Sequence, residues 1–284
     1  MRDSVKITLA LLPIILLIFL FFIHPIAITF ERSLQDLSGN YIGFERYIAL
    51  FGKKTFIDAF WYTVELALLA TIISALLAIL IALALRDTFV GKKLTLFLYQ
   101  TNISIPHVAV AVMMIMLLSQ TGLLSAIGYQ LGLIDSWTVF PKLVQGDSSL
   151  GTVISYSLKF TPFIGIAVLG VLQSFSRDFE DQSMTLGIGK IRTFFYITLP
   201  AIKPAVYSTS MIVFCFAFGS YEVPTLLGKQ QTLSMLAFNT YYNPYNPGGM
   251  YDGYAISMVI AAITLSITAV YLYISFSPKR EGRK

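Results

Sequence analysis

Few side chains in this 284-residue sequence can perform acid–base or metal chemistry. It holds two histidines, His24 and His107, and one cysteine, Cys215, all within apolar runs. Two histidines from separate runs, without companion ligands, do not make a metal site, and a lone cysteine excludes an internal disulfide. Neither HExxH nor GxSxG occurs, so we expect no metal and no intramembrane hydrolase.

One glycine-containing stretch superficially resembles a phosphate-binding loop. In Gly187-Ile188-Gly189-Lys190, the residue five before Gly189 is Met184, where that motif requires glycine. Ile191 follows the lysine, where serine or threonine is required. We therefore expect no ATP site and no cofactor in this chain.

Three charged residues interrupt or border apolar runs, where a charge is costly unless it faces a polar interior. Glu65 lies about 10 Å into its run, counted from Asp58 at 1.5 Å per residue. It either lines a cavity or pairs with a neighbouring base at the interface. Glu222 lies beside Gly219 and Pro224, which indicates an irregular helix end bordering a cavity.

Lys159 is the deepest of these charges. It lies about 14 Å past Leu150, beside Pro162, and we expect it to face the protein interior. Its ammonium contacts either a solute or backbone carbonyls that the proline leaves free. Glu65, Lys159 and Glu222 are thus candidates for lining a translocation path.

Composition indicates whether these residues lie in a soluble protein or in a membrane protein. Hydrophobic residues make up 56% of the chain and charged residues 12%, and the mean hydropathy of +0.73 favours a membrane protein. The net charge of +5 and pI of about 9.1 do not indicate nucleic-acid binding, because the basic residues are dispersed between apolar runs.

Six apolar runs are long enough to cross a bilayer as helices. We predict an all-α membrane protein, a single domain over 1–284, with spans at about 7–30, 59–85, 94–118, 150–175, 204–223 and 254–276. The first run is longer than a signal-peptide core and has no cleavage site, so we interpret it as a retained helix. A short membrane-surface helix is expected around 122–133.

Lysine and arginine are concentrated on one side of these spans. If the N-terminus is cytoplasmic, thirteen of them face the cytoplasm and six face outward. Positive residues favour the cytoplasmic side, so we predict that both termini are cytoplasmic in a multi-pass protein of the cell membrane.

The segment between the fourth and fifth spans, about 176–203, is then a cytoplasmic loop. Ser176 can cap a helix whose first turns hold Asp178, Glu180 and Asp181. Gly187 fits a left-handed helix stop, and apolar residues then recur at helical spacing until Pro200 and Pro204 end or kink the segment. The segment is either a docking helix pair or a pair lying flat on the membrane surface.

The loop resembles the cytoplasmic signature of permease subunits of binding-protein-dependent ABC importers, E-A-A-x3-G-x9-I-x-L-P. Asp181-Gln182-Ser183 takes the E-A-A position, and Gly187, Ile197, Leu199 and Pro200 match in register. Gln182 and Ser183 depart from the two alanines. The segment FGSYEVPTLLG, 218–228, looks most like permeases of the spermidine/putrescine type.

The resemblance implies a coupling helix at 176–200 that sits on a cytosolic ATPase, with Asp181, Gln182, Ser183, Gly187, Ile197, Leu199 and Pro200 as coupling residues. It also implies an ATPase dimer that binds the ATP, a second permease subunit (a paralogue or a copy) and an extracytoplasmic solute-binding protein. The chain would form half of a pathway for a small polar solute and would not itself be an enzyme. A self-sufficient secondary transporter or channel is the alternative, although such a protein would not need the loop.

Several classes of solute are compatible with the sequence. The resemblance favours a polyamine, and Glu65 and Glu222 suit an organic cation. Lys159 would instead suit a phosphonate or an anionic iron chelate, and a sugar is a further alternative.

Overall fold

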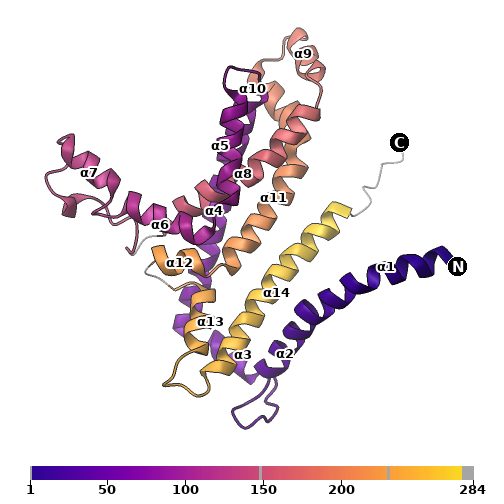
Figure 1. Cartoon of the computed structure of the whole chain (residues 1–284), viewed down its shortest axis with the longest axis vertical. Helices are drawn as coiled ribbons and strands as arrows, with labels where there is room; N and C mark the ends of the chain where they lie inside the picture. Colours follow the sequence, from indigo (N-terminus) through magenta and orange to yellow (C-terminus); the bar gives the residue numbers. More distant parts are fainter. Residues whose placement is uncertain (1, 147–148, 229–230, 277–284) are drawn as a thin grey trace. The chain divides into compact units, whose positions relative to one another are not determined.

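The computed structural model describes residues 2–146, 149–228 and 231–276. Within these ranges the chain is helical and has no strands, as Figure 1 shows. Six helical segments are long and apolar enough to cross a membrane: Leu9–Ser33, Lys54–Arg86, His107–Gln130, Leu150–Ser174, Lys190–Gly219 and Gly249–Ser275. The predicted all-α class with six spans is confirmed. Lys229 and the C-terminal basic residues, used above to predict orientation, lie outside the described residues.

The helices follow one another with short connections. They are α1 (Arg2–Ile18), η1 (Phe19–Ile23), α2 (His24–Ser33), α3 (Glu45–Phe51), α4 (Lys54–Arg86), α5 (Lys92–Ser104), α6 (His107–Leu118), α7 (Leu123–Gln130), η2 (Trp137–Val139), α8 (Leu150–Ser174), α9 (Asp178–Thr185), α10 (Lys190–Thr193), η3 (Phe194–Thr198), α11 (Leu199–Gly219), α12 (Glu222–Leu227), α13 (Leu233–Tyr241) and α14 (Gly249–Phe276). Helix α7 is the short helix expected around 122–133, although it belongs to the span-length segment His107–Gln130, so its place on the membrane surface stays a prediction.

By its internal contacts the chain divides into two compact units. Unit 1 comprises Met1–Phe60 and Leu233–Ile263, and unit 2 comprises Trp61–Thr232 and Thr264–Lys284. That the chain forms a single domain stays a prediction.

Unit 1 is held together by one carboxylate near the start of α14. Asp252 accepts hydrogen bonds from Arg46 Nη1 at 2.5 Å and from Lys53 Nζ at 3.1 Å. Arg46 also donates to the Gln35 carbonyl at 2.9 Å, and its guanidinium lies over the Tyr251 ring. This acid therefore ties the start of α14 to α3 and to the connection that precedes α3.

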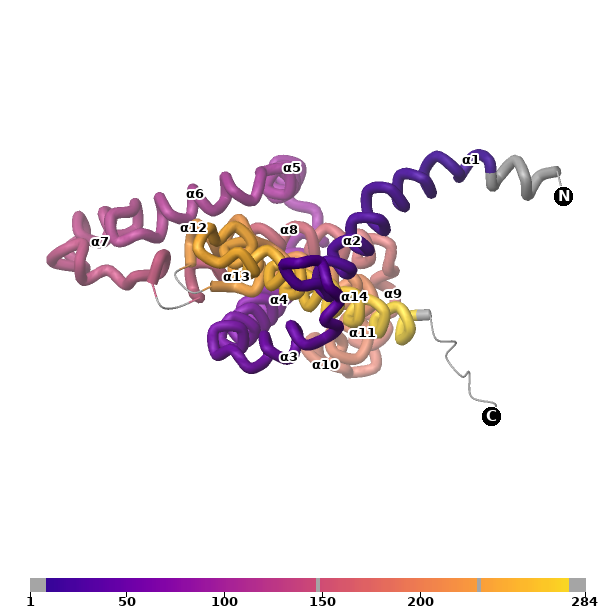
Figure 2. The backbone as a smooth tube through the Cα atoms, turned by 90° about the horizontal axis from the view of Figure 1, so that it is seen from below, coloured from indigo at the N-terminus to yellow at the C-terminus, as the bar shows by residue number. Residues whose placement is uncertain are grey.

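Helix α8 is the centre of unit 2. It packs against α5, α6, α11 and α12, and most of its residues are buried. Its sequence permits close packing because it is rich in small residues, among them Gly151, Ser155, Thr161 and Gly165. Figures 1 and 2 both show α6 and α7 extending to one side of the α4, α5, α8 and α11 bundle.

The expected third span at 94–118 is broken in the structure. Ile105 and Pro106 are extended and separate α5 from α6, and the span-length segment runs instead from His107 to Gln130. A proline has no N–H for the helix ladder and disfavours helical geometry in the residue before it. The sequence did not reveal this break, because the span was predicted from apolar character and the run contains no charged residue.

The expected fifth span at 204–223 begins much earlier, because Pro200 and Pro204 do not end the helix. The turn before Pro200 widens into the π-helix η3, in which the Leu199 N–H bonds to the Phe194 carbonyl. Pro200 then enters the first turn of α11, where its missing N–H is harmless. The same arrangement occurs at η1, where the His24 N–H bonds to the Phe19 carbonyl just before Pro25.

Candidate functional site

The loop between the fourth and fifth spans is a compact helix pair. Gly187 has φ +83°, which confirms the left-handed stop expected from the sequence. The turn closes with hydrogen bonds from Gly187 N–H to the Met184 carbonyl (3.0 Å) and from Ile188 N–H to the Ser183 carbonyl (3.1 Å). These two bonds define a Schellman motif, which satisfies carbonyls at the end of α9. At its start, Ser176 Oγ accepts from the N–H of Asp178, the first residue of α9, although the N-cap position itself is held by Arg177 and not by Ser176 as predicted.

The two short helices are joined by a buried pair of hydroxyl groups. Ser183 Oγ lies 2.5 Å from Thr193 Oγ1, and both residues are buried. A buried hydroxyl needs a hydrogen-bond partner, so the serine that replaces the second alanine of the signature is matched by a threonine on α10. The pair fixes α10 on α9.

The other signature residues lie in different environments. Asp181 and Gln182 are exposed on α9, and Pro200 is exposed at the start of α11. Ile197 and Leu199 are half-buried at the junction of η3 and α11. The structure thus brings Gly187 and Ser183 together at the turn, and holds Ile197 and Leu199 where the loop joins its span.

The loop also carries an exposed apolar surface, which we call the apolar loop surface. Its side chains are 55 to 81% exposed: Phe179, Leu186, Ile191, Phe195 and Tyr196. They lie on α9, in the turn after it, on α10 and on η3, and exposed large apolar side chains of this kind indicate a partner or membrane contact.

A largely buried ion pair attaches the loop to the rest of unit 2. Arg86, the last residue of α4, donates from Nη1 to both Glu180 carboxylate oxygens at 2.8 and 2.7 Å. Thr198 Oγ1 donates to the same carboxylate at 2.5 Å, and Arg86 Nη2 donates to the Phe175 carbonyl at 3.3 Å. Sequence reasoning missed Arg86 and Thr198 as site residues, since no local pattern links them to Glu180, which lies 94 residues from Arg86 and 18 residues from Thr198.

Electrostatics keep this carboxylate ionised. Burial acts to raise the pKa of Glu180, but the hydrogen bonds from Thr198 and Arg86 outweigh it, so the pKa lies below its usual value. A second, exposed pair joins Arg177 to Asp87, the residue after α4. The hydrogen bond and charge of Arg177 lower the pKa of Asp87.

Lys159 is buried and its ammonium is fully engaged. Nζ donates to the carbonyls of Asn102 (2.7 Å), Ile103 (2.9 Å) and Ile105 (2.5 Å) at the break between α5 and α6. A lysine ammonium has three donors, so all are used. The interior position expected for Lys159 is confirmed, and its contacts match the carbonyl alternative. The carbonyls belong to the end of α5 and to Ile105 in the break, however, and Pro106 leaves that of Asn102 free, whereas we expected Pro162 to be responsible.

Glu65 and Glu222 are exposed, and each accepts a hydrogen bond from a serine that lies close to it. Ser149 Oγ donates to Glu65 at 3.3 Å, and Ser220 Oγ donates to Glu222 at 3.3 Å. No hydrogen bond or ion pair joins Glu65, Lys159 and Glu222 to one another within the part of the chain that the structure describes. Their place in a translocation path stays a prediction.

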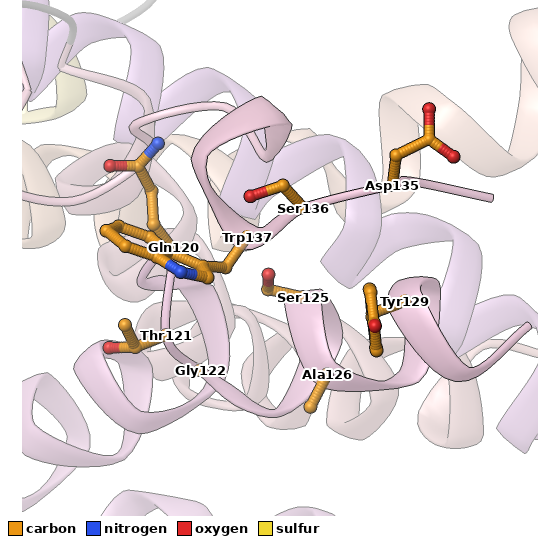
Figure 3. A pocket seen from close by; sticks show the side chains of 9 residues that line it. All are labelled: Gln120, Thr121, Gly122, Ser125, Ala126, Tyr129, Asp135, Ser136 and Trp137. Carbon is orange, nitrogen blue, oxygen red and sulfur yellow. The ribbon is translucent and has the colours of Figure 1, made fainter. Parts of the chain in front are cut away.

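The connection between α6 and α8 contains a pocket of about 420 Å³. Figure 3 shows its lining from Gln120 to Trp137, with the Trp137 indole beside Gln120 and Ser125 between Trp137 and Tyr129. Gln120 Nε2 donates to the Thr138 and Phe140 carbonyls, which holds the η2 segment against the end of α6. The pocket combines aromatic and polar side chains and is open to solvent.

The chain matches known proteins over nearly its whole length. Residues 70–282 match the family of binding-protein-dependent transport system inner membrane components. The sulfoquinovosyl glycerol transport system permease protein SmoG of Agrobacterium fabrum is 27% identical, over 96% of this chain and 91% of that protein. The sn-glycerol-3-phosphate transport system permease protein UgpA of Shigella dysenteriae is 25% identical, over 91% and 90%.

The fold is shared with a solved transporter as well. One chain in the crystal structure of a bacterial alginate ABC transporter, in complex with an alginate pentasaccharide-bound periplasmic protein, superposes with a TM-score of 0.76 at 21% identity, covering 99% of this chain and 98% of that one. The chain therefore belongs to the binding-protein-dependent transport system inner membrane component family: it is an integral membrane permease subunit of an ABC importer, not an enzyme.

Proposed function

We propose that this permease forms half of a translocation pathway and takes its energy from a pair of cytosolic ATPases that dock on residues 176–200. The second half is a copy or a paralogue of this chain, and ATP is bound by the ATPases. The signature residues Asp181, Gln182, Ser183, Gly187, Ile197, Leu199 and Pro200 form or support the docking element.

The apolar loop surface is the observation that carries this proposal. Its side chains project from helices held rigid by the Schellman turn and by the Ser183–Thr193 pair. A rigid apolar protrusion suits insertion into a groove of another protein, since the element has to move as a unit. A pair lying on lipid would not need such a fixed turn.

We further propose that an extracytoplasmic solute-binding protein contacts the connection between α6 and α8. In the predicted topology this connection faces outward, and its pocket exposes Trp137 and Tyr129. The alginate transporter of similar fold was solved with a periplasmic protein, which supports a partner of this kind.

For the solute, we propose a hydroxyl-rich molecule of the sugar or glycerol-phosphate class. The names of SmoG and UgpA describe sulfoquinovosyl glycerol and sn-glycerol-3-phosphate transport. These relatives do not support the polyamine. The Lys159 ammonium is bound by carbonyls, so it gives no reason to prefer a phosphonate or an iron chelate.

Uptake in cells carrying the whole system tests the solute class, and co-purification tests the docking of the ATPase. We expect glycerol phosphate or a glycoside, and not spermidine, to compete for transport, and an ATPase to co-purify with the tagged permease. Competition by spermidine alone would contradict the solute class. Transport by the purified permease alone in proteoliposomes would favour the self-sufficient transporter or channel.

A further inference from the structure

We propose that Arg86, Glu180 and Thr198 form a positioning joint, which delivers the movement of α9 to α4 and α11 together. This inference rests on the proposed docking of α9 on an ATPase. None of the three belongs to the sequence signature. They position the coupling helix and need not touch either the ATPase or the solute.

The joint connects three elements through one carboxylate. Glu180 lies on α9, Arg86 ends α4, and Thr198 is the last residue of η3, directly before α11. The side chains of Arg86 and Glu180 are only 9% and 16% exposed, and both carboxylate oxygens are bound. Figure 1 shows α9 and α10 at the end of unit 2 where α5 begins.

The chain alone cannot transmit a push from α9 to α4. The connection before α9 leaves the helical conformation at Phe175, and α4 lies far from α9 in the sequence. Buried charge-assisted hydrogen bonds have defined geometry, so they can link the two helices mechanically. Arg86 also binds the Phe175 carbonyl, so the same guanidinium braces the connection between α8 and α9.

The nearby Arg177–Asp87 pair provides a matched control. It also connects the α9 region to the residue after α4, but its side chains are 53% and 66% exposed. Exposed ion pairs hold little geometry because water competes for both partners. The joint should therefore depend on Glu180 and not on Asp87, although Glu180→Gln and Asp87→Asn remove the same charge.

The first experiment measures geometry in the permease alone. Spin labels are placed at Val90 and Leu186, both highly exposed, in a Cys215→Ala background. We expect one narrow distance distribution for the parent and for Asp87→Asn, and at least a twofold broader one for Glu180→Gln and Arg86→Met. Equal widths in all four proteins would overturn the joint.

The second experiment measures coupling in the assembled importer in proteoliposomes. In Glu180→Gln and Arg86→Met, we expect the ATPase to stay bound while solute transported per ATP hydrolysed falls at least fivefold. The double variant should fall no further than the worse single variant, because the two residues act as one unit. A transport-to-hydrolysis ratio of the double variant that falls by the product of the two single effects contradicts the proposal. Single variants with the same ratio as Asp87→Asn contradict it as well.

Failure of the joint and failure of the docking proposal give different results. If the parent permease does not retain an ATPase, docking is wrong and transmission through the joint fails with it. If the parent retains the ATPase but Glu180→Gln loses it, Glu180 belongs to the docking surface, and the positioning role is overturned.

Discussion

A buried lysine on a membrane helix usually attracts a functional explanation, and Lys159 has a structural one. Pro106 cannot donate a hydrogen bond, so the Asn102 carbonyl four residues earlier loses its helical partner. In hydrocarbon such a carbonyl needs another donor, and the lysine supplies it from α8. The charge is therefore part of how the α5–α6 break is tolerated.

Lys159→Met should destabilise the permease. Methionine keeps most of the length but leaves three carbonyls without a donor, and we expect a loss of about 2 kcal/mol. Unfolding in detergent checks this, with the exposed Lys142→Met as a control that removes the same charge. Normal stability with abolished uptake would instead place Lys159 in the solute path.

Gly187 is a residue whose role follows from its backbone alone. A Cβ there would meet no atom within 4 Å, so a substitution acts only through the left-handed φ. Gly187→Val should cost roughly 1–2 kcal/mol at the turn and reduce ATPase co-purification, while Gly187→Asn should be tolerated.

Gly189 gives the control for this prediction. It has φ −68° and equally open surroundings, so Gly189→Val should leave the ATPase bound. Equal retention of the ATPase by both valine variants would show that the turn conformation is unimportant.

At the scale of elements, α5 and α8 satisfy each other's proline defects. Pro162 leaves the Leu158 carbonyl of α8 free, and Asn102 Nδ2 on α5 donates to it at 2.7 Å. In return, Lys159 of α8 binds the Asn102 carbonyl that Pro106 leaves free. Each helix thus has a carbonyl that a proline leaves free and that a side chain of the other helix satisfies, which fixes their register.

Gly165→Ala should disrupt this contact between α5 and α8. The new Cβ would lie 2.0 Å from Tyr99 Oη, which donates to the Thr161 carbonyl. We expect a loss of about 1–3 kcal/mol from overpacking. Thermal unfolding of the purified permease measures it.

Two further variants make the test specific. In a Tyr99→Phe background the alanine should cost less, because the hydroxyl is gone and the next atom lies at 3.0 Å. Gly170→Ala on the same helix meets nothing within 4 Å and should be neutral or stabilising. If the penalty is the same with and without the hydroxyl, close packing at Gly165 is not its source.

Local patterns predicted elements better than they predicted contacts. The helix pair at 176–200 and its stop at Gly187 were readable because capping residues and helical spacing are short-range signals. The break at Ile105–Pro106 and the π-turn before Pro200 were not, because whether a proline ends, kinks or merely widens a helix depends on the neighbours available to its freed carbonyls.

At the scale of the whole molecule, orientation is a prediction that charge alone supports. With Cys215 replaced by alanine, single cysteines at Ser38 and Tyr245 should react with an impermeant thiol reagent from outside, and those at Val90 and Leu186 should not. All four positions are exposed. The reverse pattern would contradict the predicted cytoplasmic termini, and the 176–203 loop could not then face an ATPase.

The candidate site shows the same limit between local and long-range signals. Gly187 and the acids of α9 could be found from the sequence. Arg86 and Thr198 could not, since their shared partner Glu180 lies 94 residues from Arg86 and 18 residues from Thr198, beyond the reach of local patterns. Glu65 was chosen for its depth in an apolar run and Glu222 for the irregular helix end beside it, and in this chain each binds a nearby serine.

The π-turn at Phe194–Thr198 gives the chain an unusual tolerance to changes in length. A π-turn holds one residue more than the α-helical path it replaces, so deleting one residue there would let the helix continue as an ordinary α-helix. The five residues of the π-turn cover nearly the same rotation and rise as four α-helical residues, so the loop and the span would keep their relative orientation. A single-residue deletion at this point would therefore leave unchanged both the face that the docking helices present and the membrane-spanning part of α11.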